Sequence, residues 1–435
     1  MEISRKKIKI LLIQPENPRI HRFRKWQFNN FAQITIPYLA AYINTGQYEV
    51  RIIDEYNQKI PYNESFGLIA LTVNTANANH CYRISDRFGA KGASVVMGGP
   101  HASIMPDEAQ THCDHLIVGE AEVTWPEFLN DFYYGVAKKR YKSAKPPGLN
   151  EIPFPRWDML KKRNAIMKSS VIASRGCPYN CDYCNLKQIY HDRFCTRPAD
   201  EVICEIKRMK SGYLIFWDDN FFADKTFALK LMRELQPLKK KWAAQVTLKS
   251  CDDEELLETA QQSGCLYLFV GLESFSQDSL ASVNKNINKT DRYESIIKSI
   301  HAHNIMIQAG IIFGFDTDTS GIFDTTLRAC ERMGIDGVTA SLLSPLPGSK
   351  IYEKLKAENR LITDDWNYYD SKTNVAFFPK NMSAEQLYNG YMDFRKRFYS
   401  FSSFIKRMKV SKCRIFYNFM INLGYRLAIK EMPDM

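Results

Sequence analysis

The 435-residue chain has 45% hydrophobic and 25% charged residues, an ordinary composition for a soluble globular protein of two or three domains. No uncharged stretch approaches the ~20 residues that a membrane-spanning helix requires, and the N-terminal segment lacks the pattern of a signal peptide. Of the net charge of +11, residues 395–430 carry +10, as ten Lys or Arg and no Asp or Glu, so the remaining +1 argues against a nucleic-acid groove through the core.

Short apolar runs separated by helical patterns predict a parallel α/β domain at the start of the chain. Strands are expected at 8–13, 48–54, 66–73, 93–99 and 115–122, and a first helix at 34–43. Strands that alternate with helices predict a doubly wound, Rossmann-like fold, in which ligands bind beyond the carboxyl ends of the strands.

The loops of this domain give weaker signals. The first strand is not followed by Gly-x-Gly-x-x-Gly, so a dinucleotide-binding site is disfavoured. The pair Gly98-Gly99 would let a flat ligand approach the backbone closely, although a plain turn also accounts for it. Residues 136–168 then lose the alternation, and their prolines block regular helix, so this segment is predicted to be a linker.

The segment 174–185, SRGCPYNCDYCN, places Cys177, Cys181 and Cys184 in a Cys-x3-Cys-x2-Cys spacing. Such a compact loop can aim three thiolates at one point, and soft sulfur ligands suit an iron–sulfur cluster. Three cysteines leave one iron of a four-iron cluster open for a small molecule. The alternative is a zinc knuckle with a distant fourth ligand, but the local run supplies only three of the four ligands that a structural zinc site needs. Because a cluster requires reduced thiols, we expect a reducing cytosol.

Beyond the cysteine loop, strand and helix patterns alternate again. Strands are expected at 169–174, 213–222, 242–249, 265–274, 305–319 and 337–349, with helices at 201–210, 227–238, 253–264, 292–304 and 323–334. Repeated β/α units predict a full or partial TIM barrel, whose chemistry lies at the carboxyl ends of its strands. Polar candidates at those ends are Asp218, Asp219, Gln245, Lys249 and Glu273, of which Gln245 and Lys249 are expected on the third strand. A helix N-cap or a strand-end salt bridge is the alternative interpretation of each.

The cysteine spacing and the strand that leads into it resemble the radical S-adenosylmethionine (SAM) superfamily. In that family the open iron of a [4Fe-4S] cluster chelates SAM, and an electron from the cluster cleaves SAM to a 5′-deoxyadenosyl radical. The resemblance implies that the three cysteines bind this cluster and that Tyr183 lies near the adenine. It also implies that Asp218 or Asp219 receives the SAM amino nitrogen, since a carboxylate accepts hydrogen bonds from an amine.

The same resemblance makes the remaining polar strand ends candidates for SAM binding. Lys249 could pair with the SAM carboxylate, Glu273 is a candidate for SAM or substrate contact, and Gln245 completes the set. No catalytic residue is assigned beyond these.

Three segments of the first domain together resemble the cobalamin-binding domain that precedes many radical SAM cores: VVMGGPHAS (95–103), the strand end at Thr72 and DHLIVGEAEVTWPEFL (114–129). In that family the loops after these strands bury the nucleotide tail of cobalamin, so Thr72, Gly98 and Gly99 are the expected contacts.

One departure concerns the lower face of cobalamin. Cobalamin domains that ligate cobalt from below carry Asp-x-His-x-x-Gly after the second strand, where this chain has DEYNQK (54–59) without a histidine. Its absence does not exclude the cofactor, because radical SAM relatives often lack it. His101 is an alternative ligand, although a loop histidine that is hydrogen-bonded to the backbone is favoured.

The C-terminal residues predict helices. A helix is expected over 381–400, with Ser383 as its N-cap. From Phe401 onward, aromatic and aliphatic residues interleave with basic ones. A basic amphipathic segment of this kind either lies on an anionic membrane surface or packs against the core and exposes its charges, and both interpretations stay open.

We therefore expect an α/β protein with four parts: a Rossmann-like cobalamin-binding domain (1–135), a linker (136–168), a full or partial TIM-barrel radical SAM core (169–370) and a mainly helical cap with a basic tail (371–435). The expected cofactors are a [4Fe-4S] cluster, SAM and cobalamin. The expected partners are a small-molecule or lipid-like substrate and an electron donor such as flavodoxin or ferredoxin, with no nucleic acid. The expected location is the cytoplasm, with membrane association left open.

The resemblance implies a class B radical SAM methyltransferase, which methylates an unactivated carbon in a cobalamin-dependent reaction. One alternative is a cobalamin-domain radical SAM enzyme that catalyses a cyclisation or rearrangement. A third is a non-catalytic cobalamin or iron–sulfur sensor, against which the SAM-type strand ends argue.

Overall fold

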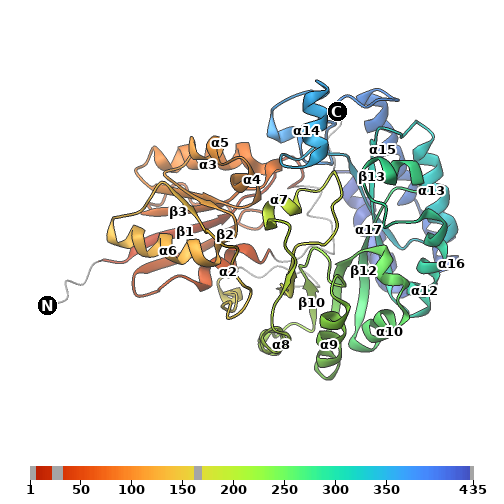
Figure 1. Cartoon of the computed structure of the whole chain (residues 1–435), viewed down its shortest axis with the longest axis horizontal. Coiled ribbons are helices and arrows are strands. Elements are labelled where there is room, and N and C mark those ends of the chain that lie inside the picture. Colours follow the sequence, from red (N-terminus) through yellow and green to blue (C-terminus); the bar gives the residue numbers. More distant parts are fainter. Residues whose placement is uncertain (1–5, 22–32, 161–168, 432–435) are drawn as a thin grey trace.

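The structure, a computed structural model, describes residues 6–21, 33–160 and 169–431. Two parallel six-stranded sheets organise it (Figure 1). The first sheet has the strand order β2-β1-β3-β4-β5-β6. Its strands are β1 (Ile8–Gln14), β2 (Tyr48–Asp54), β3 (Leu68–Thr72), β4 (Ser94–Gly98), β5 (His115–Val118) and β6 (Arg140–Lys142). The five predicted strands are present, and β6 is an additional strand within the segment that was predicted to be a linker.

Helices cover both faces of the first sheet, as a doubly wound fold requires. On one face α2 (Thr35–Ala41) and α6 (Ala121–Tyr134) pack against Ile10 and Leu12 of β1. Leu11 and Ile13, which alternate with them, face the other core, below α3 (Ala78–Gly89). Two short helices, α4 (Pro100–Ile104) and α5 (Pro106–Gln110), complete that side.

The second sheet is an open barrel with the strand order β14-β13-β12-β11-β10-β7. Its strands are β7 (Ser169–Val171), β10 (Tyr213–Phe216), β11 (Lys241–Val246), β12 (Cys265–Glu273), β13 (Met306–Phe313) and β14 (Gly337–Leu342). The intervening helices are α8 (Ala199–Arg208), α9 (Lys225–Leu235), α10 (Glu254–Ser263), α12 (Tyr293–Ala302) and α13 (Ile322–Met333). Because β7 and β14 do not pair among the described residues, the barrel is partial, which is one of the two predicted forms.

The barrel strands end earlier than predicted, and this moves several polar residues into loops. β10 ends at Phe216, so Asp218 and Asp219 follow the strand. The placement of Lys249 on the third strand was wrong: β11 ends at Val246, and Lys249 lies in the 3₁₀ turn η4 (Leu248–Asp252) with its side chain exposed. The strand stops there because the Asn220 side chain, not a neighbouring strand, accepts the hydrogen bond of the Thr247 N–H.

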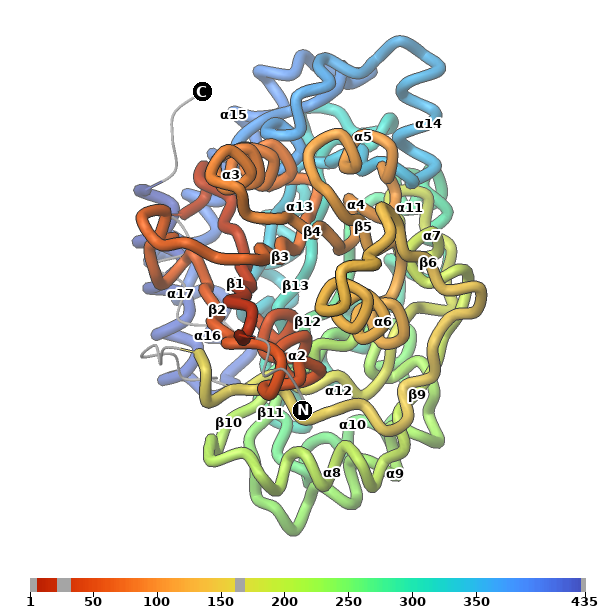
Figure 2. Tube along the Cα trace, turned by 90° about the vertical axis from the view of Figure 1, so that its left-hand side faces the viewer, coloured from red at the N-terminus to blue at the C-terminus, as the bar shows by residue number. Residues whose placement is uncertain are grey.

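The C-terminal region ties the two sheets together. Residues 342–380 cross from the barrel to the first domain and include α14 (Lys350–Ala357) and η6 (Trp366–Tyr368). Trp366 packs in the same core as α3, and its Nε1–H donates to Glu108 Oε1 at 2.7 Å. Figure 2 shows the first sheet lying in front of the barrel, with α14 beside α5 at one end of both.

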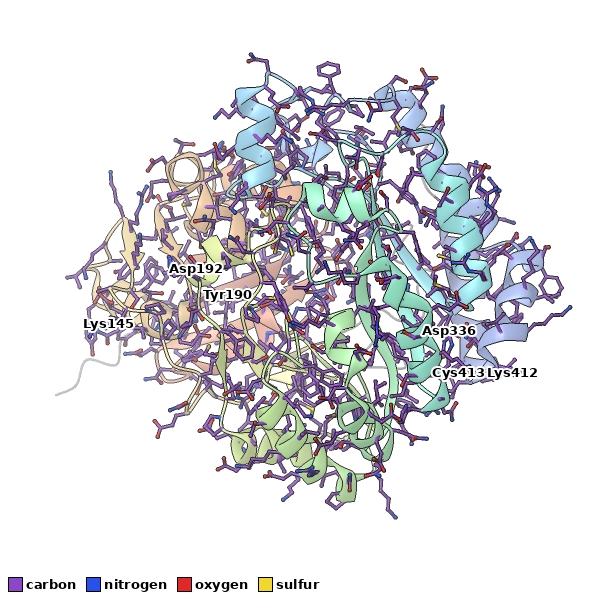
Figure 3. The ribbon with its side chains drawn as sticks, turned by 45° about the vertical axis from the view of Figure 1, so that its right-hand side comes forward. Lys145, Tyr190, Asp192, Asp336, Lys412 and Cys413 are labelled. Carbon is purple, nitrogen blue, oxygen red and sulfur yellow. The ribbon has the colours of Figure 1, made fainter. Side chains whose placement is uncertain are left out.

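Three helices follow, α15 (Ala384–Phe398), α16 (Phe401–Ser411) and α17 (Ile415–Ile429). α15 begins at the predicted N-cap, Ser383, which forms a capping box with Gln386. α16 and α17 are fixed to the barrel at Asp336, whose Oδ1 accepts a hydrogen bond from Ser411 Oγ at 2.5 Å. In Figure 3 Asp336 lies beside Lys412 and Cys413, on the opposite side of the molecule from Tyr190. Within the described residues, no helix has both the length and the apolar character needed to cross a bilayer.

Candidate active site

The cysteine loop is framed by two short antiparallel strands, β8 (Ser174–Arg175) and β9 (Cys195–Thr196). Gly176, immediately before the first cysteine, has a φ of +86°, and a Cβ atom there would lie 2.0 Å from Arg193 O. Only glycine fits this position, because a side chain would meet both a disfavoured backbone conformation and a backbone atom. The lead-in residue Gly176 therefore fixes where the loop starts.

The three thiols of Cys177, Cys181 and Cys184 lie close enough to affect one another's ionisation. Burial raises the pKa of the Cys177 thiol, and it raises the pKa of Cys184 to about 12, with the neighbouring thiols adding to both effects. Among the residues that the structure describes, no three His, Cys, Asp or Glu side chains converge closely enough to hold a single metal ion. The three thiols fit a cluster, in which each cysteine binds a different iron, better than a zinc knuckle.

A buried ammonium group accompanies the thiols. Lys285 is 6% exposed, and its Nζ lies 3.8 Å from Oε1 of Glu273, which ends β12 with a φ of +65°. Burial opposes the charge on Lys285, but Glu273 and the three thiols raise its pKa above the usual value. Burial raises the pKa of Glu273 above its usual value, although Lys285 and a hydrogen bond from Tyr183 act in the opposite direction. The structure thus brings Glu273 and Tyr183 together beside the cysteines.

Lys285 was missed in the sequence because nothing local marks it. It lies in a loop twelve residues after Glu273, in a stretch, SVNKNINKT (282–290), whose polar composition is typical of any surface turn. A basic residue in the loop after a polar strand end is the only signal that could have suggested it.

The two aspartates after β10 have different roles. Asp218 is 4% exposed, and both its oxygens accept hydrogen bonds from the chain ahead of the cysteines, Oδ1 from Ala173 N at 2.9 Å and Oδ2 from Ser174 Oγ at 2.6 Å. Burial raises the pKa of Asp218 to about 7. Asp219 Oδ2 accepts from Gly176 N at 2.9 Å, and this side chain also lines a cavity. Asp219 is therefore the better placed of the two to bind a ligand.

Gln245 supports this loop. Its Nε2 donates to the backbone oxygen of Asp219 at 3.1 Å, so it holds the aspartate in place from the neighbouring strand β11. Lys249, further along the chain, does not line the cavity. The contacts of all these residues with SAM stay predictions.

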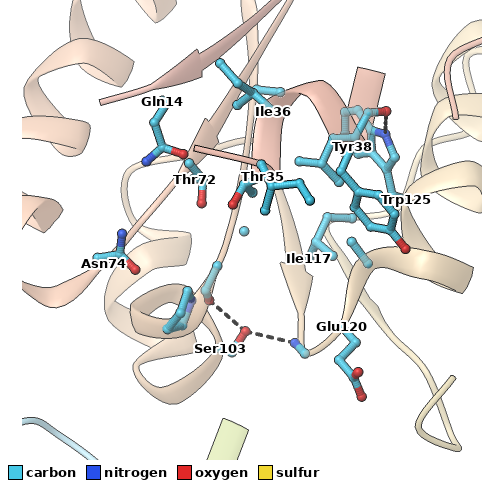
Figure 4. A pocket seen from close by; sticks show the side chains of 18 of the residues that line it. Gln14, Thr35, Ile36, Tyr38, Thr72, Asn74, Ser103, Ile117, Glu120 and Trp125 are labelled. Carbon is cyan, nitrogen blue, oxygen red and sulfur yellow. Dashed lines mark hydrogen bonds between the residues drawn. The ribbon is translucent and has the colours of Figure 1, made fainter. Parts of the chain in front are cut away.

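The cavity, of about 410 Å³, lies at the carboxyl ends of the strands of the first sheet (Figure 4). From the first sheet it is lined by the ends of β1, β3, β4 and β5, which include the predicted contacts Thr72, Gly98 and Gly99. From the barrel side it is lined by Arg175, Ile189, Tyr190, Trp217 and Asp219. Gly99 has a φ of +105°, and a Cβ there would lie 2.8 Å from Val73 O, so a glycine is required at this rim.

Buried polar atoms without a partner point to a ligand in this cavity. Gln14 is 5% exposed and ends β1, and its Oε1 has no hydrogen-bond partner among the described residues. The same is true of Glu122 Oε2, and both side chains line the cavity. Leaving such atoms unpaired costs about 1–3 kcal/mol each, which a ligand rich in amide groups, such as cobalamin, would recover. The residues present fit that cofactor.

Neither His101 nor the segment after β2 is placed to bind the lower face of a cobalamin in this cavity. His101 is fully buried and does not line the cavity, so it is not placed to ligate a metal there. Its Nδ1 lies 3.2 Å from Thr75 Oγ1 and its Nε2 lies 3.5 Å from Glu108 Oε1, so its partners are side chains rather than the expected backbone. Residues 54–59 do not line the cavity either, because β2 is the edge strand of the sheet.

Ion pairs join the two halves of the site. Arg175, which precedes the cysteines, contacts Glu120 Oε1 at 3.0 Å and Glu122 Oε1 at 2.6 Å. Arg193 reaches the other oxygen of Glu120 at 2.5 Å. Although burial opposes it, Arg175 lowers the pKa of Glu122 below the usual value. The cysteine loop is thereby held against the helix that starts after β5.

Comparisons with known proteins match both halves. A B12 binding domain model matches residues 29–129, a Radical SAM superfamily model matches 171–330, and a domain of unknown function (DUF4070) matches 349–418. The bacteriochlorophyllide d C-12(1)-methyltransferase of Chlorobaculum tepidum is 30% identical over 411 residues, which are 91% of this chain and 89% of that protein. The chain belongs to the radical SAM superfamily, in the subgroup with a B12-binding domain.

Further relatives and solved structures point to the same family and fold. The hopanoid C-2 methylase of Rhodopseudomonas palustris is 26% identical, over 72% of this chain and 60% of that protein. The methyltransferase TsrM from Kitasatospora setae, solved with tryptophan and a SAM analogue, has the same fold at 16% identity and a TM-score of 0.64, over 81% of this chain and 76% of that one. OxsB, with aqua-cobalamin and SAM bound, gives a TM-score of 0.67 at 13% identity, over 96% of this chain and 72% of that one.

These matches confirm the predicted family, fold class, enzyme class and cofactors. The chain is a cobalamin-dependent radical SAM enzyme of the methylating type. The domain boundaries and the individual ligand contacts stay predictions.

Proposed function

We propose that this enzyme methylates an unactivated carbon of an apolar, multi-ring small molecule. The observation that carries the proposal is the cavity in which the strand ends of the B12-binding domain face Arg175, Tyr190, Trp217 and Asp219 of the barrel side. A methyl carrier and a radical generator have to share one enclosed space if a short-lived substrate radical is to take up a methyl group. The substrate class follows from the relatives, since two of them are named for bacteriochlorophyllide d and a third for hopanoids.

The chain's own residues have separate tasks in this reaction. When bound, the cluster supplies the electron that cleaves SAM, and cobalamin carries the methyl group. Cys177, Cys181 and Cys184 would hold the cluster, and the Lys285 ammonium would stabilise the negative charge of these three thiolates. Asp219, whose Oδ2 already accepts a hydrogen bond from Gly176 N, would accept one from the SAM amine, and Glu273 with Tyr183 would border the SAM site.

We also infer the surroundings in which the enzyme works. Thiols that hold an iron–sulfur cluster need a reducing compartment, which we take to be the cytoplasm. Reduction of the cluster requires an external one-electron donor of the flavodoxin or ferredoxin kind. The basic C-terminal helices bring the enzyme to a membrane surface, where an apolar substrate would be concentrated.

The test is an anaerobic assay of the reconstituted holoenzyme with a bacteriochlorophyllide as the probe substrate. We expect 5′-deoxyadenosine, S-adenosylhomocysteine and methylated product to form together. Cys177→Ala should abolish cluster absorbance and SAM cleavage, whereas Cys113→Ala, outside the loop, should change neither. Retained cleavage in Cys177→Ala would overturn the cluster assignment.

A second outcome, cyclisation without methylation, has one specific observation in its favour. The anaerobic magnesium-protoporphyrin IX monomethyl ester cyclase of Rubrivivax gelatinosus is 22% identical over 87% of this chain and 75% of that protein. Formation of 5′-deoxyadenosine without S-adenosylhomocysteine would favour this outcome and reject methylation. The third possibility, a sensor, predicts that neither product forms.

A further inference from the structure

The outward side of α16 and α17 carries a cluster of exposed apolar side chains. Thirteen large hydrophobic side chains of the described residues are exposed, and six of them lie within residues 401–419. These six are Phe401, Ile405, Val410, Ile415, Phe416 and Phe419, which we call the C-terminal apolar patch. Single exposed apolar residues are normal, but a concentration of this kind marks an interaction surface.

Helix geometry places the apolar and basic residues of α17 in one line along the helix. On α17, Phe416, Phe419, Leu423, Arg426 and Lys430 follow one another at intervals of three or four residues, so they form one stripe along the helix. The first half of the stripe is apolar and the second half is basic. The rings of Phe404 and Phe419 meet at 5.9 Å, which joins the patch across α16 and α17.

The opposite sides of these helices pack against the barrel and are hydrogen-bonded to it. Arg407 of α16 is fully buried and donates to Ile335 O at 2.7 Å and to Asn422 Oδ1 of α17 at 2.8 Å. Asn422 in turn donates to the backbone oxygen of Asp336 at 2.9 Å. Because this buried network fixes both helices, they cannot turn to hide the patch without breaking hydrogen bonds to a buried guanidinium.

The charges on α16 and α17 around the patch are positive, and of these Lys406 pairs with Glu331 of α13 at 3.0 Å. Exposed basic side chains border it at Lys409, Lys412, Arg426 and Lys430, for which the structure describes no ion pair. No acidic residue occurs between Asp393 and Glu431. An apolar surface rimmed by cations is complementary to an anionic bilayer, where rings enter the acyl boundary and ammonium groups meet headgroups.

We propose that α16 and α17 dock this enzyme on the surface of an anionic lipid bilayer through the C-terminal apolar patch and its rim of basic residues. A second copy of the chain is a poorer occupant, since a two-fold contact would bring two equally positive surfaces together. The contact is peripheral, because neither helix is long enough to span the bilayer. No residue of the patch lines the cavity, so docking leaves the active site open. The docking names the surface behind the membrane contact of the proposed function but does not depend on methylation.

The experiment is co-sedimentation of the full-length holoenzyme with vesicles. We expect binding to vesicles of equal parts phosphatidylglycerol and phosphatidylcholine, weak binding to phosphatidylcholine alone, and release at about 0.5 M NaCl, where charges are screened beyond a few ångströms. Phe416→Ser/Phe419→Ser should lower the bound fraction about tenfold, because the apolar contribution is lost. Lys409→Gln/Lys412→Gln/Arg426→Gln should remove the preference for anionic vesicles.

The matched control is Tyr134→Ser/Val136→Ser, which removes two side chains of 57% and 66% exposure at the end of α6. This variant should bind vesicles like the unchanged enzyme. Cluster absorbance and SAM cleavage should stay intact in every variant, which separates a docking failure from a folding or methylation failure. Holoenzyme that stays in the supernatant of anionic vesicles would overturn the proposal. So would a dimer in light scattering that Phe416→Ser/Phe419→Ser dissociates, since the occupant would then be a second copy.

Discussion

Neighbouring residues of one type have different functions when their hydrogen-bond partners differ. Asp218 and Asp219 are adjacent in the loop after β10, yet the buried Asp218 binds Ala173 and Ser174 while the half-buried Asp219 lines the cavity. An acceptor whose two oxygens are both used by the chain has little left for a ligand. Which aspartate can bind a ligand therefore depends on whether its oxygens can still accept a hydrogen bond, and not on its position in the sequence motif.

Asp219→Asn should weaken SAM binding and slow SAM cleavage at least about tenfold, since an amide is a poorer acceptor for an ammonium group than a carboxylate. Cobalamin content and thermal stability should change little. The measurements are the KM for SAM and the rate of 5′-deoxyadenosine formation. Asp218→Asn is the comparison: it should cost about 1–3 kcal/mol of stability by disturbing buried hydrogen bonds. Unchanged SAM kinetics in Asp219→Asn would contradict the assignment.

A second residue-scale prediction concerns Lys372, beside the edge strand of the barrel. Its Nζ donates to Ala340 O at 2.7 Å and to Ser341 Oγ at 2.9 Å, and burial, with the charge of Arg395, lowers the pKa of Lys372 to about 7. The folded state then binds fewer protons than the unfolded state between pH 7 and the ordinary lysine value of about 10.4. Stability should therefore rise with pH across this window.

Thermal unfolding of the apoprotein between pH 7 and 9.5 measures this effect. Lys372→Met should flatten the rise, whereas Lys350→Met, whose side chain is 61% exposed, should leave it unchanged. An equal slope in the Lys372→Met variant would show that other groups cause the pH dependence.

At the scale of elements, short framing segments position the chemistry. The β8–β9 pair and Gly176 fix the start of the cysteine loop, and the loop after β10 is tied to it by the bond from Gly176 N to Asp219. β11 supports the same loop through Gln245. The β8–β9 pair, the loop after β10 and strand β11 thus position the cysteine loop together, through hydrogen bonds between side chains and backbone groups.

Gly176→Ala should lower iron incorporation, because the added Cβ would clash with Arg193 O and the φ of +86° disfavours alanine. The backbone strain alone is about 1–2 kcal/mol. Iron and sulfide content after reconstitution are the measurements. Gly212→Ala is the matched control, since nothing lies within 4 Å of a Cβ built there. Full iron content in Gly176→Ala would show that the loop tolerates a shift.

At the scale of the whole molecule, ion pairs join the two domains at the cavity, and the packing of Trp366 joins them at a second place. Arg175 and Arg193 meet Glu120 and Glu122 at the cavity, while Trp366 packs in the core of the first domain. Both connections hold the strand ends of the B12-binding domain against the cysteine loop. The geometry of the cavity therefore depends on contacts between distant parts of the chain.

Arg175→Met should reduce cobalamin retention and destabilise the protein by about 3–5 kcal/mol, because it leaves the buried Glu122 without its cation. Corrinoid absorbance after gel filtration and thermal unfolding report the two effects. Arg51→Met, which breaks an exposed pair with Glu64, should cost no more than about 1 kcal/mol and keep cobalamin. Equal behaviour of the two variants would show that the Arg193–Glu120 pair and the Trp366 contact hold the domains without Arg175.

The sequence by itself determined the features that are local. The cysteine spacing, the alternation of strands and helices, the Ser383 cap and the concentration of positive charge are each set by residues a few positions apart, so they could be predicted together with the family. Strand ends were less certain: Lys249 was placed on a strand because its side-chain pattern continues past Val246, where the pairing stops.

Only the tertiary structure decided which of these residues meet. Lys285 beside the cysteines, Gln14 Oε1 in the cavity, which no described residue hydrogen-bonds, and the pairing of Arg175 with Glu122 depend on residues far apart in sequence. It also packed the basic tail against the barrel through the buried Arg407 and left Phe416 exposed, whereas contact of that exposed surface with a membrane stays a prediction. The physical reason is that periodicity reports which face of an element is apolar, whereas the partner of that face depends on how the two sheets pack in space.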